Sequence, residues 1–530
     1  MPLNIDQIQV AIKNEFGNKS IEELIITEKE LASKKNTFLS NHKTKSTYKK
    51  LINHIEDIQS QPRFPYTNGP RQYQIDAYNK WIENGYKGIF EMATGTGKTI
   101  TSLNCLLELH KQTKSYKAII AVPTTALLEQ WKRECSKFNF KNVITVSSKE
   151  KWNDKLSFFN AASRLTDISF IVIVTYASLI RAKFLSHFKL LPQETLLIAD
   201  EVHNLGAASL LKLLPGIHLQ KRIGLSATPS RKYDLEGNSA IDSFFNDTRP
   251  YIFSYSMKQA LALGWLCKYK YFPHIVYLTD EELSEYIKIS KQLLKYFDSK
   301  TGRYKECQEV DILLLQRKRI IHKAVNKKTI FRQIVHNEFR NKGNLKYSLI
   351  YVPEGLEPDY SKIDEYEEDE EEFRLINEYT RIVKDIDESI MVKQYTSQTQ
   401  GKDDIINDFE KGIVHVLTSM KCLDEGVDVP RSELAVFCSS TGNPRQFIQR
   451  RGRVLRLHKD KIFAVIHDLV VVPRIFSDQG NYEMERNLLK KELERVVDFS
   501  ELSMNKIDTY EALNETIDSY NLNLNDLIFE

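Results

Sequence analysis

Two series of short apolar runs constrain the fold of this chain more than any other feature of its 530 residues. The first series comprises Ala118–Val122, Val143–Val146, Phe170–Val174, Leu196–Ala199 and Ile223–Leu225, and the second comprises Tyr347–Val352, Ile390–Lys393, Val414–Leu417, Leu434–Phe437 and Ile462–Ile466. Segments with helical patterns separate the runs. Continuously apolar strands that alternate with helices are typical of parallel sheets covered on both faces. The chain is therefore predicted to be an α/β protein with two parallel sheets, whose ligands bind at the carboxyl ends of the strands.

A glycine-containing loop joins a predicted strand at Lys87–Phe90 to a predicted helix from Ile100. Glycines let backbone amides approach phosphates closely, a lysine reaches the β- and γ-phosphates, and a hydroxyl holds Mg²⁺. Met92 stands where the complete phosphate-loop pattern has its first glycine. The predicted ATP-binding residues of the loop are Thr94, Gly95, Thr96, Gly97, Lys98 and Thr99.

Two other stretches supply partners for this loop. Arg71 and Gln74 lie upstream, where an amide side chain can pair with an adenine edge, although an ordinary amphipathic helix start uses the same residue types. Asp200 and Glu201 directly follow an apolar strand. We expect Asp200 to bind Mg²⁺ together with Thr99, and Glu201 to deprotonate the attacking water. A surface turn is the alternative for this acidic pair.

Composition limits the remaining choices. The hydrophobic content of 42% is enough for large cores, and the net charge of +4 does not by itself indicate a nucleic-acid protein. No apolar run is long enough to span a bilayer, so we expect a cytoplasmic protein without membrane contact. The six cysteines are widely spaced and are expected to be core thiols.

Several motifs together resemble those of superfamily 2 helicases. Thr94–Thr99, Asp200–His203 and Ser226–Thr228 resemble motifs I, II and III, and Gln74 and Pro123–Thr125 resemble the Q motif and motif Ia. Thr418–Pro430 resembles motif V, and Gln449–Arg456 resembles motif VI. The resemblance implies two tandem RecA-like domains of the P-loop NTPase class, with ATP and Mg²⁺ as cofactors.

The resemblance also implies a role for each matching residue. The implied catalytic residues are Lys98, Asp200, Glu201, Arg453 and Arg456, and further implied ATP contacts are Gly426, Asp428 and Gln449. The implied nucleic-acid contacts are Pro123, Thr124, Thr125, Thr175 and an expected turn formed by Thr418 and Ser419. The residues that would couple the two activities are His203, Ser226 and Thr228. Arg453 and Arg456 lie about one helical turn apart. The guanidinium group of arginine is planar and permanently charged. Because the second domain supplies it, the resemblance implies that hydrolysis depends on closure of the two domains.

The predicted domain organisation has five parts. These are a helical N-terminal region at 1–67, a first RecA-like domain at 68–250, a mainly helical connecting segment at 251–345, a second RecA-like domain at 346–475 and a helical acidic tail at 476–530. The tail is expected to pack on the body or to dock a partner.

Charged residues are unevenly distributed along the chain, and two charged segments each allow two interpretations. Residues 312–345 carry nine Lys or Arg and one acid, Glu338, and form either a phosphate-contacting face or a solvated helix surface. The acidic block 364–372 is expected to be an exposed loop or helix start, with partner binding as the alternative.

The expected function is that of an ATP-dependent DNA helicase or translocase. DNA is preferred because Asp200–His203 and Gln449–Arg456 resemble the branch that holds restriction-enzyme motor subunits and repair translocases, a setting of bacterial or phage DNA repair or antiviral defence. The alternatives are an ATP-gated nucleic-acid clamp or scaffold that does not unwind processively, and an RNA helicase. The chain carries no recognised nuclease signature, so cutting would need a partner protein.

Overall fold

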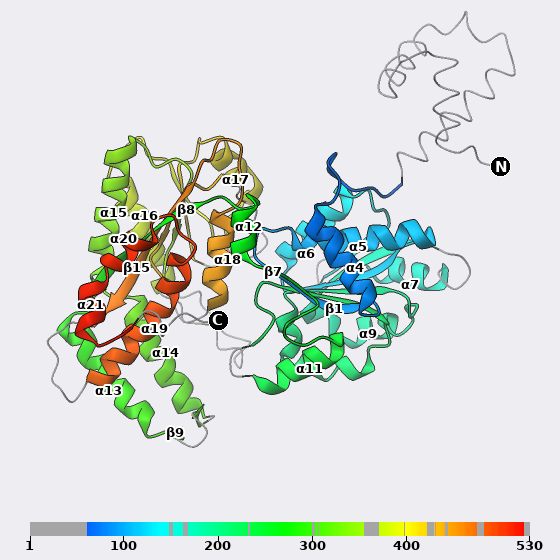
Figure 1. Ribbon diagram of the computed structural model, residues 1–530, viewed down its shortest axis with the longest axis horizontal. Helices are drawn as coiled ribbons and strands as arrows, with labels where there is room; N and C mark the ends of the chain where they lie inside the picture. Colours follow the sequence, from blue (N-terminus) through cyan, green and yellow to red (C-terminus); the bar gives the residue numbers. More distant parts are fainter. Residues whose placement is uncertain are drawn as a thin grey trace, which may run out of the picture. The chain divides into compact units, whose positions relative to one another are not determined.

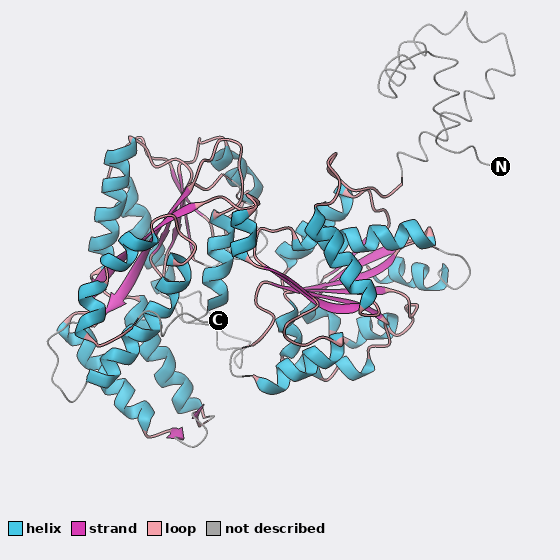
Figure 2. Ribbon diagram, in the orientation of Figure 1, coloured by secondary structure: helices cyan, strands magenta, loops and turns pink. Residues whose placement is uncertain are grey.

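The computed structural model describes residues 61–147, 152–162, 168–231, 234–298, 303–305, 307–353, 370–396, 398–420, 429, 431–439, 444–473 and 482–523. Most of the predicted N-terminal helical region, residues 364–369 of the acidic block, and the predicted ATP contacts Gly426 and Asp428 lie outside these ranges. Residues 64–530 form one unit, in which helices cover two separate sheets (Figures 1 and 2).

The first sheet has seven parallel strands in the order β3-β4-β2-β5-β6-β1-β7. Its strands are β1 Lys87–Met92, β2 Lys117–Val122, β3 Val143–Val146, β4 Phe170–Thr175, β5 Leu196–Asp200, β6 Lys221–Ser226 and β7 Phe253–Tyr255. All five predicted runs of this series form strands. Central strands such as β4 are buried along their whole length, which explains why they are apolar without alternation.

Alternate side chains of these strands face two helical layers. Ile120, for example, packs in the cluster that contains Leu103 and Trp131, whereas its neighbour Ile119 packs in the cluster of Phe184 and Phe245. The helices around this sheet are α4 Gln72–Glu83, α5 Lys98–Thr113, α6 Thr125–Lys137, α7 Asn153–Ala162, α8 Tyr176–Leu179, α9 Ala182–Phe188, α10 Ala208–Leu211, α11 Leu235–Phe245 and α12 Met257–Ala262, with short 3₁₀ turns η1 Val202–Gly206 and η2 Leu214–Gly216.

The second sheet has six parallel strands in the order β12-β13-β11-β14-β15-β8. They are β8 Tyr269–Tyr277, β11 Ser348–Tyr351, β12 Val392–Gln394, β13 Val416–Ser419, β14 Leu434–Phe437 and β15 Ala464–Val472. The prediction of two parallel sheets is therefore confirmed. The helices that follow β8 are α13 Asp280–Leu294, α14 Gln308–His322, α15 Lys327–Lys342, α16 Glu370–Lys384, α17 Lys402–Glu410, α18 Pro444–Val454, α19 Tyr482–Ser500, α20 Lys506–Glu511 and α21 Asn514–Ser519.

The segment between the two predicted domains is not only helical. It contributes β7 to the first sheet and β8 to the second, and a two-stranded ribbon, β9 Phe297–Asp298 with β10 Arg303–Tyr304, lies between α13 and α14. The edge strand β8 contains Lys270 and Pro273, and several of its side chains are only half-buried. An edge strand needs neither continuous burial nor a donor at every position, so its sequence lacks the apolar run that marks the central strands.

The C-terminal segment closes the open edge of β8. The Asn505 side chain accepts a hydrogen bond from Tyr271 N at 2.8 Å and donates one to Tyr271 O at 2.9 Å, and Met504 N donates to Tyr269 O at 2.8 Å. These bonds replace those of a further strand and satisfy an edge that would otherwise be open to intermolecular pairing.

Replacing Asn505 with alanine is expected to lower the free energy of unfolding by about 1–3 kcal/mol, because the backbone N–H of the buried Tyr271 loses its partner, while Tyr271 O keeps a hydrogen bond from Thr509 Oγ1 at 3.0 Å. Denaturant unfolding monitored by circular dichroism measures this change. Asn514→Ala, a change at an exposed position of α21, is the matched control. Equal stabilities of the two variants would contradict the edge-capping role.

Four of the described cysteines, Cys105, Cys135, Cys267 and Cys438, are buried free thiols as predicted. Cys307 is only half-buried because it precedes α14 beside the β9–β10 ribbon, so the expectation of a core thiol is wrong there. Cys422 lies outside the described residues. None of the helices in the described part of the chain combines the length and apolar character needed to cross a bilayer.

Candidate active site

Three neighbouring strands of the first sheet end at one place. β6 lies between β1 and β5, and the loop Ala93–Gly97 follows β1 while Ser226 and Asp200 are the last residues of β6 and β5. Because all three strands are parallel, their carboxyl ends share one edge, the position where α/β sheets bind ligands.

The loop after β1 has a left-handed backbone conformation at two positions, and glycine occupies both. Gly95 and Gly97 have φ of +86° and +87°, in the left-handed region that favours glycine. A Cβ on Gly95 would lie 3.0 Å from Gly452 O, so the loop also leaves little room beside α18. The Tyr73 hydroxyl donates to Thr96 O at 2.6 Å and fixes the middle of the loop. Since Gly97 precedes the first residue of α5, the loop ends at a helix N-terminus, a favourable position for phosphate.

The ammonium group of Lys98 interacts with the predicted catalytic charged side chains from both sheet domains. The same group donates to Met92 O at 3.2 Å. Burial lowers the pKa of Lys98, Glu201 and Asp200 oppose this by raising it, and Arg456 and Arg453 lower it further. Carboxylates at and just after the end of β5, and arginines in and just after α18, therefore act on the same ammonium group.

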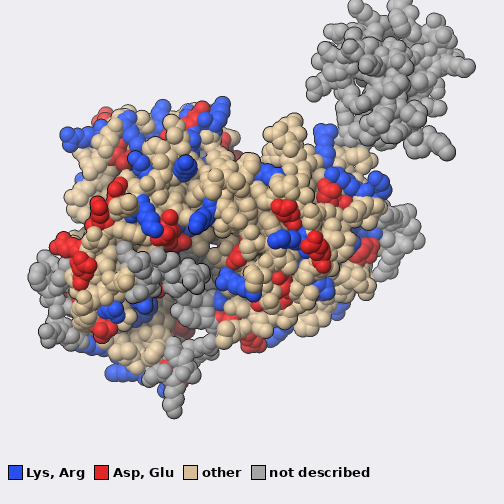
Figure 3. All heavy atoms as spheres, in the orientation of Figure 1, with Lys and Arg blue, Asp and Glu red and all other residues tan. Residues whose placement is uncertain are grey.

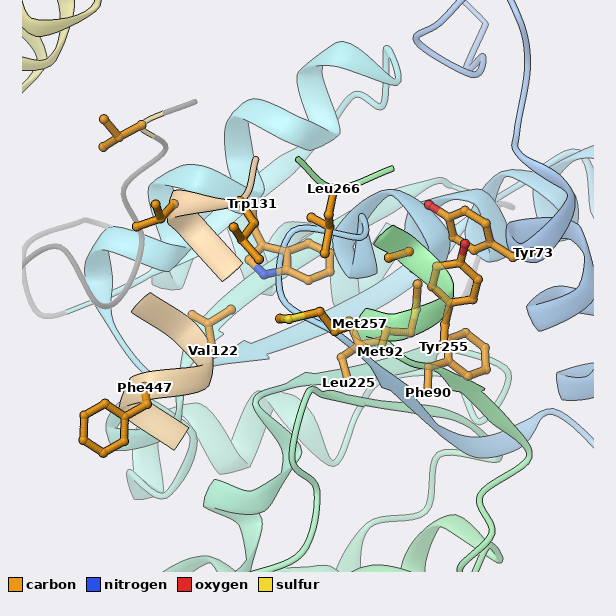
Figure 4. Close-up of a cluster of buried hydrophobic side chains, with 14 of the residues drawn as sticks. Tyr73, Phe90, Met92, Val122, Trp131, Leu225, Tyr255, Met257, Leu266 and Phe447 are labelled. Atoms are coloured by element: carbon orange, nitrogen blue, oxygen red, sulfur yellow. The ribbon is translucent and has the colours of Figure 1, made fainter. Parts of the chain in front are cut away.

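The carboxylate of Asp200 is buried and accepts a hydrogen bond from the indole of Trp131. Trp131 Nε1 donates to Asp200 Oδ2 at 2.8 Å, and Glu201 N donates to Asp200 Oδ1 at 3.0 Å. The ring of Trp131 lies in an apolar cluster with Met92, Leu225 and Leu266 (Figure 4), so its N–H group is the polar atom aimed at the site. Burial and the adjacent Glu201 raise the pKa of Asp200 to about 6, while the Trp131 hydrogen bond and Lys98 lower it. Two adjacent buried carboxylates are costly without a cation, so this donor set suits Mg²⁺.

Glu201 links the two sheets. Its backbone has φ of +47°, a left-handed conformation that is uncommon for glutamate. Ser226 Oγ donates to Glu201 Oε2 at 3.2 Å, and Gln449 Nε2 of α18 donates to Glu201 Oε1 at 3.3 Å. The carboxylate of Glu201 is thereby fixed from two directions.

The residues predicted to couple the two activities lie beside Glu201. His203 Nδ1 is 3.5 Å from Glu201 Oε2 and 3.4 Å from Ser226 Oγ. Thr228 N donates to Ser226 Oγ at 3.0 Å. The end of β6 is thus hydrogen-bonded to the residues after β5, and a movement at either strand end reaches the other.

Helix α18 packs directly on the phosphate-binding loop. A Cβ on Gly452 would lie 2.4 Å from Thr94 Cβ, so only glycine fits there. Arg453 is 7% exposed, and Arg456 is half-buried just after the helix. The predicted arginine pair is therefore held close to the loop by the close approach of Gly452.

The predicted adenine contacts are engaged within the protein. Gln74 is buried, accepts from Arg71 N at 2.9 Å and donates to Thr101 Oγ1 at 3.4 Å, which closes the N-terminus of α4. The Arg71 guanidinium lies 3.8 Å from the centre of the Trp265 ring. Adenine pairing by Gln74 stays a prediction and requires these bonds to be exchanged.

The predicted nucleic-acid contacts occupy different environments. Thr124 caps α6 by accepting from Leu127 N at 3.3 Å, Pro123 precedes it, and Thr125 is exposed. Thr175 is buried and bonded to Ser178. Their contact with nucleic acid stays a prediction.

Thr418 and Ser419 need a correction. They were expected in a turn, but they are the last two residues of β13 and are fully buried, because this strand lies in the interior of the sheet between β11 and β12. Thr418 Oγ1 is 2.9 Å from Thr380 Oγ1 of α16.

Sequence reasoning missed three residues that shape the site. Trp131 of α6 had no predicted role, because no residue near it in the sequence marks its hydrogen bond to Asp200. Arg450 and Arg451 stand within the motif VI stretch but bind the second sheet and α19: Arg450 Nη1 donates to Ser439 Oγ at 2.6 Å, and Arg451 Nη1 donates to Asp498 O at 2.7 Å.

Comparison with known proteins places this geometry in a family. Residues 68–231 match the model of the type III restriction enzyme res subunit, and residues 370–458 match that of the helicase conserved C-terminal domain. The chain belongs to helicase superfamily 2. It is an ATP-hydrolysing enzyme of the helicase and translocase class. The superfamily 2 motifs recognised in the sequence thus fall within the two matched regions.

Individual relatives agree with this assignment. The chain is 26% identical over 420 residues to the DNA 3'-5' translocase XPB2 of Sulfurisphaera tokodaii, covering 78% of this chain and 83% of that protein. It is 22% identical over 407 residues to the DNA 3'-5' helicase XPB of Mycobacterium tuberculosis, covering 76% and 60%. The fold resembles the DNA-bound ATP-dependent type ISP restriction-modification enzyme LlaBIII, with a TM-score of 0.54 and 17% identity over 87% of this chain and 33% of that one.

Proposed function

We propose that this superfamily 2 enzyme moves along or remodels DNA and hydrolyses ATP between its two sheets. The observation that carries the proposal is the position of Glu201, which accepts hydrogen bonds from Ser226 of the first sheet and from Gln449 of α18. If hydrolysis requires contact between the two sheet domains, the domains close when ATP is bound and open after it is hydrolysed. Repeated closing and opening would move a DNA strand that both domains bind.

In the proposed reaction, Glu201 accepts a proton from water, and the water oxygen forms a bond to the γ-phosphorus of ATP. The bond from that phosphorus to the ADP oxygen breaks, which yields ADP and inorganic phosphate. Lys98 binds the β- and γ-phosphates, and Arg453 and Arg456 stabilise the charge that develops on the transferred group. Backbone amides of the loop at Gly95–Lys98 bind the phosphate chain.

Thr99 and Asp200 are the residues proposed to hold Mg²⁺. When bound, Mg²⁺ neutralises phosphate charge and orients the γ-phosphoryl group. The raised pKa of Asp200 supports this assignment, because burial beside Glu201 disfavours its charged form in the protein alone.

DNA is the proposed substrate, acted on in the cytoplasm in bacterial or phage DNA repair or antiviral defence. The names of the archaeal and mycobacterial relatives, both DNA 3'-5' enzymes, support DNA. The match of residues 68–231 to a restriction-enzyme subunit supports a defence setting and a nuclease partner protein.

ATP turnover measured in parallel with single-stranded DNA, duplex DNA, forked DNA and RNA tests the substrate. Each DNA form is expected to raise turnover, with RNA giving little stimulation. Stronger stimulation by RNA would replace the DNA assignment with that of an RNA helicase.

The basic segment 312–345 is a proposed part of the DNA path, although three of its lysines have partners within the protein. Lys327 is buried and donates to His322 O at 3.3 Å, Lys328 pairs with Glu378, and Lys342 pairs with Glu338 at 2.7 Å. These lysines serve the protein itself. On the face shown in Figure 3, positive and negative side chains are interspersed, so no single patch in that view marks the path.

Reversing Arg317, Lys318 and Arg319 of α14 to glutamate is expected to weaken DNA binding for all sequences alike. Each phosphate contact contributes about 0.7–0.9 to the slope of log affinity against log salt, so the slope is expected to flatten by about two units. A salt titration of binding measures it. The control reverses three exposed lysines around the first sheet, Lys155, Lys189 and Lys212. Equal slopes in the two variants would limit the path to the loops around Thr125 and Thr175.

A further inference from the structure

Helix α18 presents two sides with different partners. Gly452 and Arg453 lie three and four residues after Gln449, and all three residues contact or act on the first sheet. Phe447 and Arg451, four residues apart on another side, contact α19. The helix that carries the arginines is thus held between the ATP site and the C-terminal helix.

Arg451 is the main link to α19. Its Nη1 donates to Asp498 O at 2.7 Å, its Nη2 lies 2.9 Å from Asp498 Oδ2, and its guanidinium lies 4.5 Å from the centre of the Phe499 ring. The Arg451 side chain is 4% exposed, whereas that of Asp498 is 53% exposed. The Arg451 guanidinium therefore extends from α18 to the last turn of α19, where a positive charge is favourable because it lies at the C-terminus of that helix.

Helix α19 is itself anchored to the second sheet. Arg495 Nε donates to Asp468 Oδ2 of β15 at 2.7 Å, and its Nη2 donates to Glu492 Oε2 at 2.9 Å. Arg495 also lies 4.6 Å from the centre of the Phe447 ring of α18. Both Arg495 and Asp468 are buried, so this ion pair is shielded from solvent and fixes α19 against the sheet.

We infer that α19 positions the catalytic arginines of α18, with Arg451 and Asp498 as the positioning pair. This inference rests on the proposed function and extends it to a helix beyond residue 458, where the match to the helicase C-terminal domain ends. Arg451 does not act on the nucleotide. It sets the place of Arg453 and Arg456, which lie two and five residues further along.

Arg451→Gln is expected to lower kcat for ATP about 10- to 100-fold, because small displacements of a catalytic group are costly. Nucleotide affinity, measured by equilibrium binding of a fluorescent ATP analogue, is expected to stay unchanged. Arg451→Lys keeps the charge but not the fork, and an intermediate kcat is expected. Should Arg451→Gln unfold, as judged by thermal melting, the same comparison is made with the lysine variant.

Combination with Arg453→Ala separates positioning from general stability. If Arg451 acts through Arg453 and its neighbour, adding Arg451→Gln or Arg451→Lys to Arg453→Ala lowers the single-turnover rate much less than in the unaltered chain. The control is Arg486→Gln, in the first half of α19, where Arg486 donates to Tyr520 O at 3.1 Å and Asn521 O at 3.3 Å. It is expected to lower the melting temperature without changing kcat.

The outcomes separate this inference from the proposed function. ATP turnover that is present in the unaltered chain and lost in Lys98→Ala supports the proposed function. With that turnover present, a normal kcat in the Arg451 variants, or an equal loss in both backgrounds, overturns the positioning role alone. Absence of Lys98-dependent turnover overturns both.

Discussion

Replacing Lys98 with alanine abolishes ATP turnover, with an expected loss of at least about 10²–10³-fold, the range reported for removing one group that stabilises transition-state charge. The substitution removes the ammonium on which Asp200, Glu201, Arg453 and Arg456 all act. It removes no core packing, since Lys98 is half-buried and its ammonium group donates to Met92 O. The fold is therefore expected to persist. A steady-state phosphate-release assay, together with the far-ultraviolet circular dichroism of both proteins, measures the two parts of this result.

Lys111→Ala is the matched control for that experiment. Lys111 lies on the same helix α5 and pairs with Glu108 at 2.7 Å on the surface, with its side chain 59% exposed. Its turnover should equal that of the unaltered chain. Near-normal turnover in Lys98→Ala would contradict the assignment of the phosphate site.

Replacing Glu201 with glutamine slows hydrolysis by about 10²–10⁴-fold while ATP and Mg²⁺ remain bound, because it removes the proposed base and spares Asp200. The glutamine side chain has the same shape, and its carbonyl oxygen can still accept from Ser226 or Gln449. Equilibrium nucleotide binding and single-turnover hydrolysis, measured on the same preparation, distinguish binding from chemistry.

Glu91→Gln serves as the control for this second substitution. Glu91 is on β1 just before the loop and pairs outward with Arg249 at 3.0 Å and Ser254 at 3.1 Å. Normal turnover is expected. Loss of ATP binding in Glu201→Gln, with hydrolysis of the remaining bound ATP unimpaired, would mean that the roles of Asp200 and Glu201 are exchanged.

The sequence predicted those parts of the fold whose physical signal is local. Strands such as β2 and β4 are buried on both faces, so burial leaves a continuous apolar run. The loop glycines and the acidic pair after β5 are likewise marked by chemistry at adjacent positions. Parallel strands then bring their ends to one edge, which is why neighbours in the site could be predicted without coordinates.

The contacts that required the structure join residues far apart in the chain. Nothing near Trp131 in sequence indicates that its indole bonds Asp200, 69 residues away. The burial of Thr418 follows from the strands on either side of β13, which come from other parts of the chain. Strand β8 has a mixed pattern because it lies at the edge of the sheet, and the residue that caps this edge, Asn505, follows Tyr271 by 234 residues.

The motif VI stretch illustrates the same limit within a few residues. Its four arginines look equivalent in sequence, yet Arg453 and Arg456 act on Lys98 while Arg450 and Arg451 bind Ser439 and Asp498. Helical periodicity does not separate them, since Arg450 lies three residues before Arg453, and only the surrounding elements decide which arginines face the phosphate-binding loop.

Strand displacement and ATP turnover measured together on forked DNA test whether hydrolysis drives movement. Displaced strand is expected to accumulate only with hydrolysable ATP, in proportion to the phosphate released, and both processes are expected to stop in Lys98→Ala. Displacement of a third strand from a triplex reports translocation where unwinding is absent. DNA-stimulated turnover without displacement in either assay would contradict movement and would identify the protein as an ATP-gated clamp.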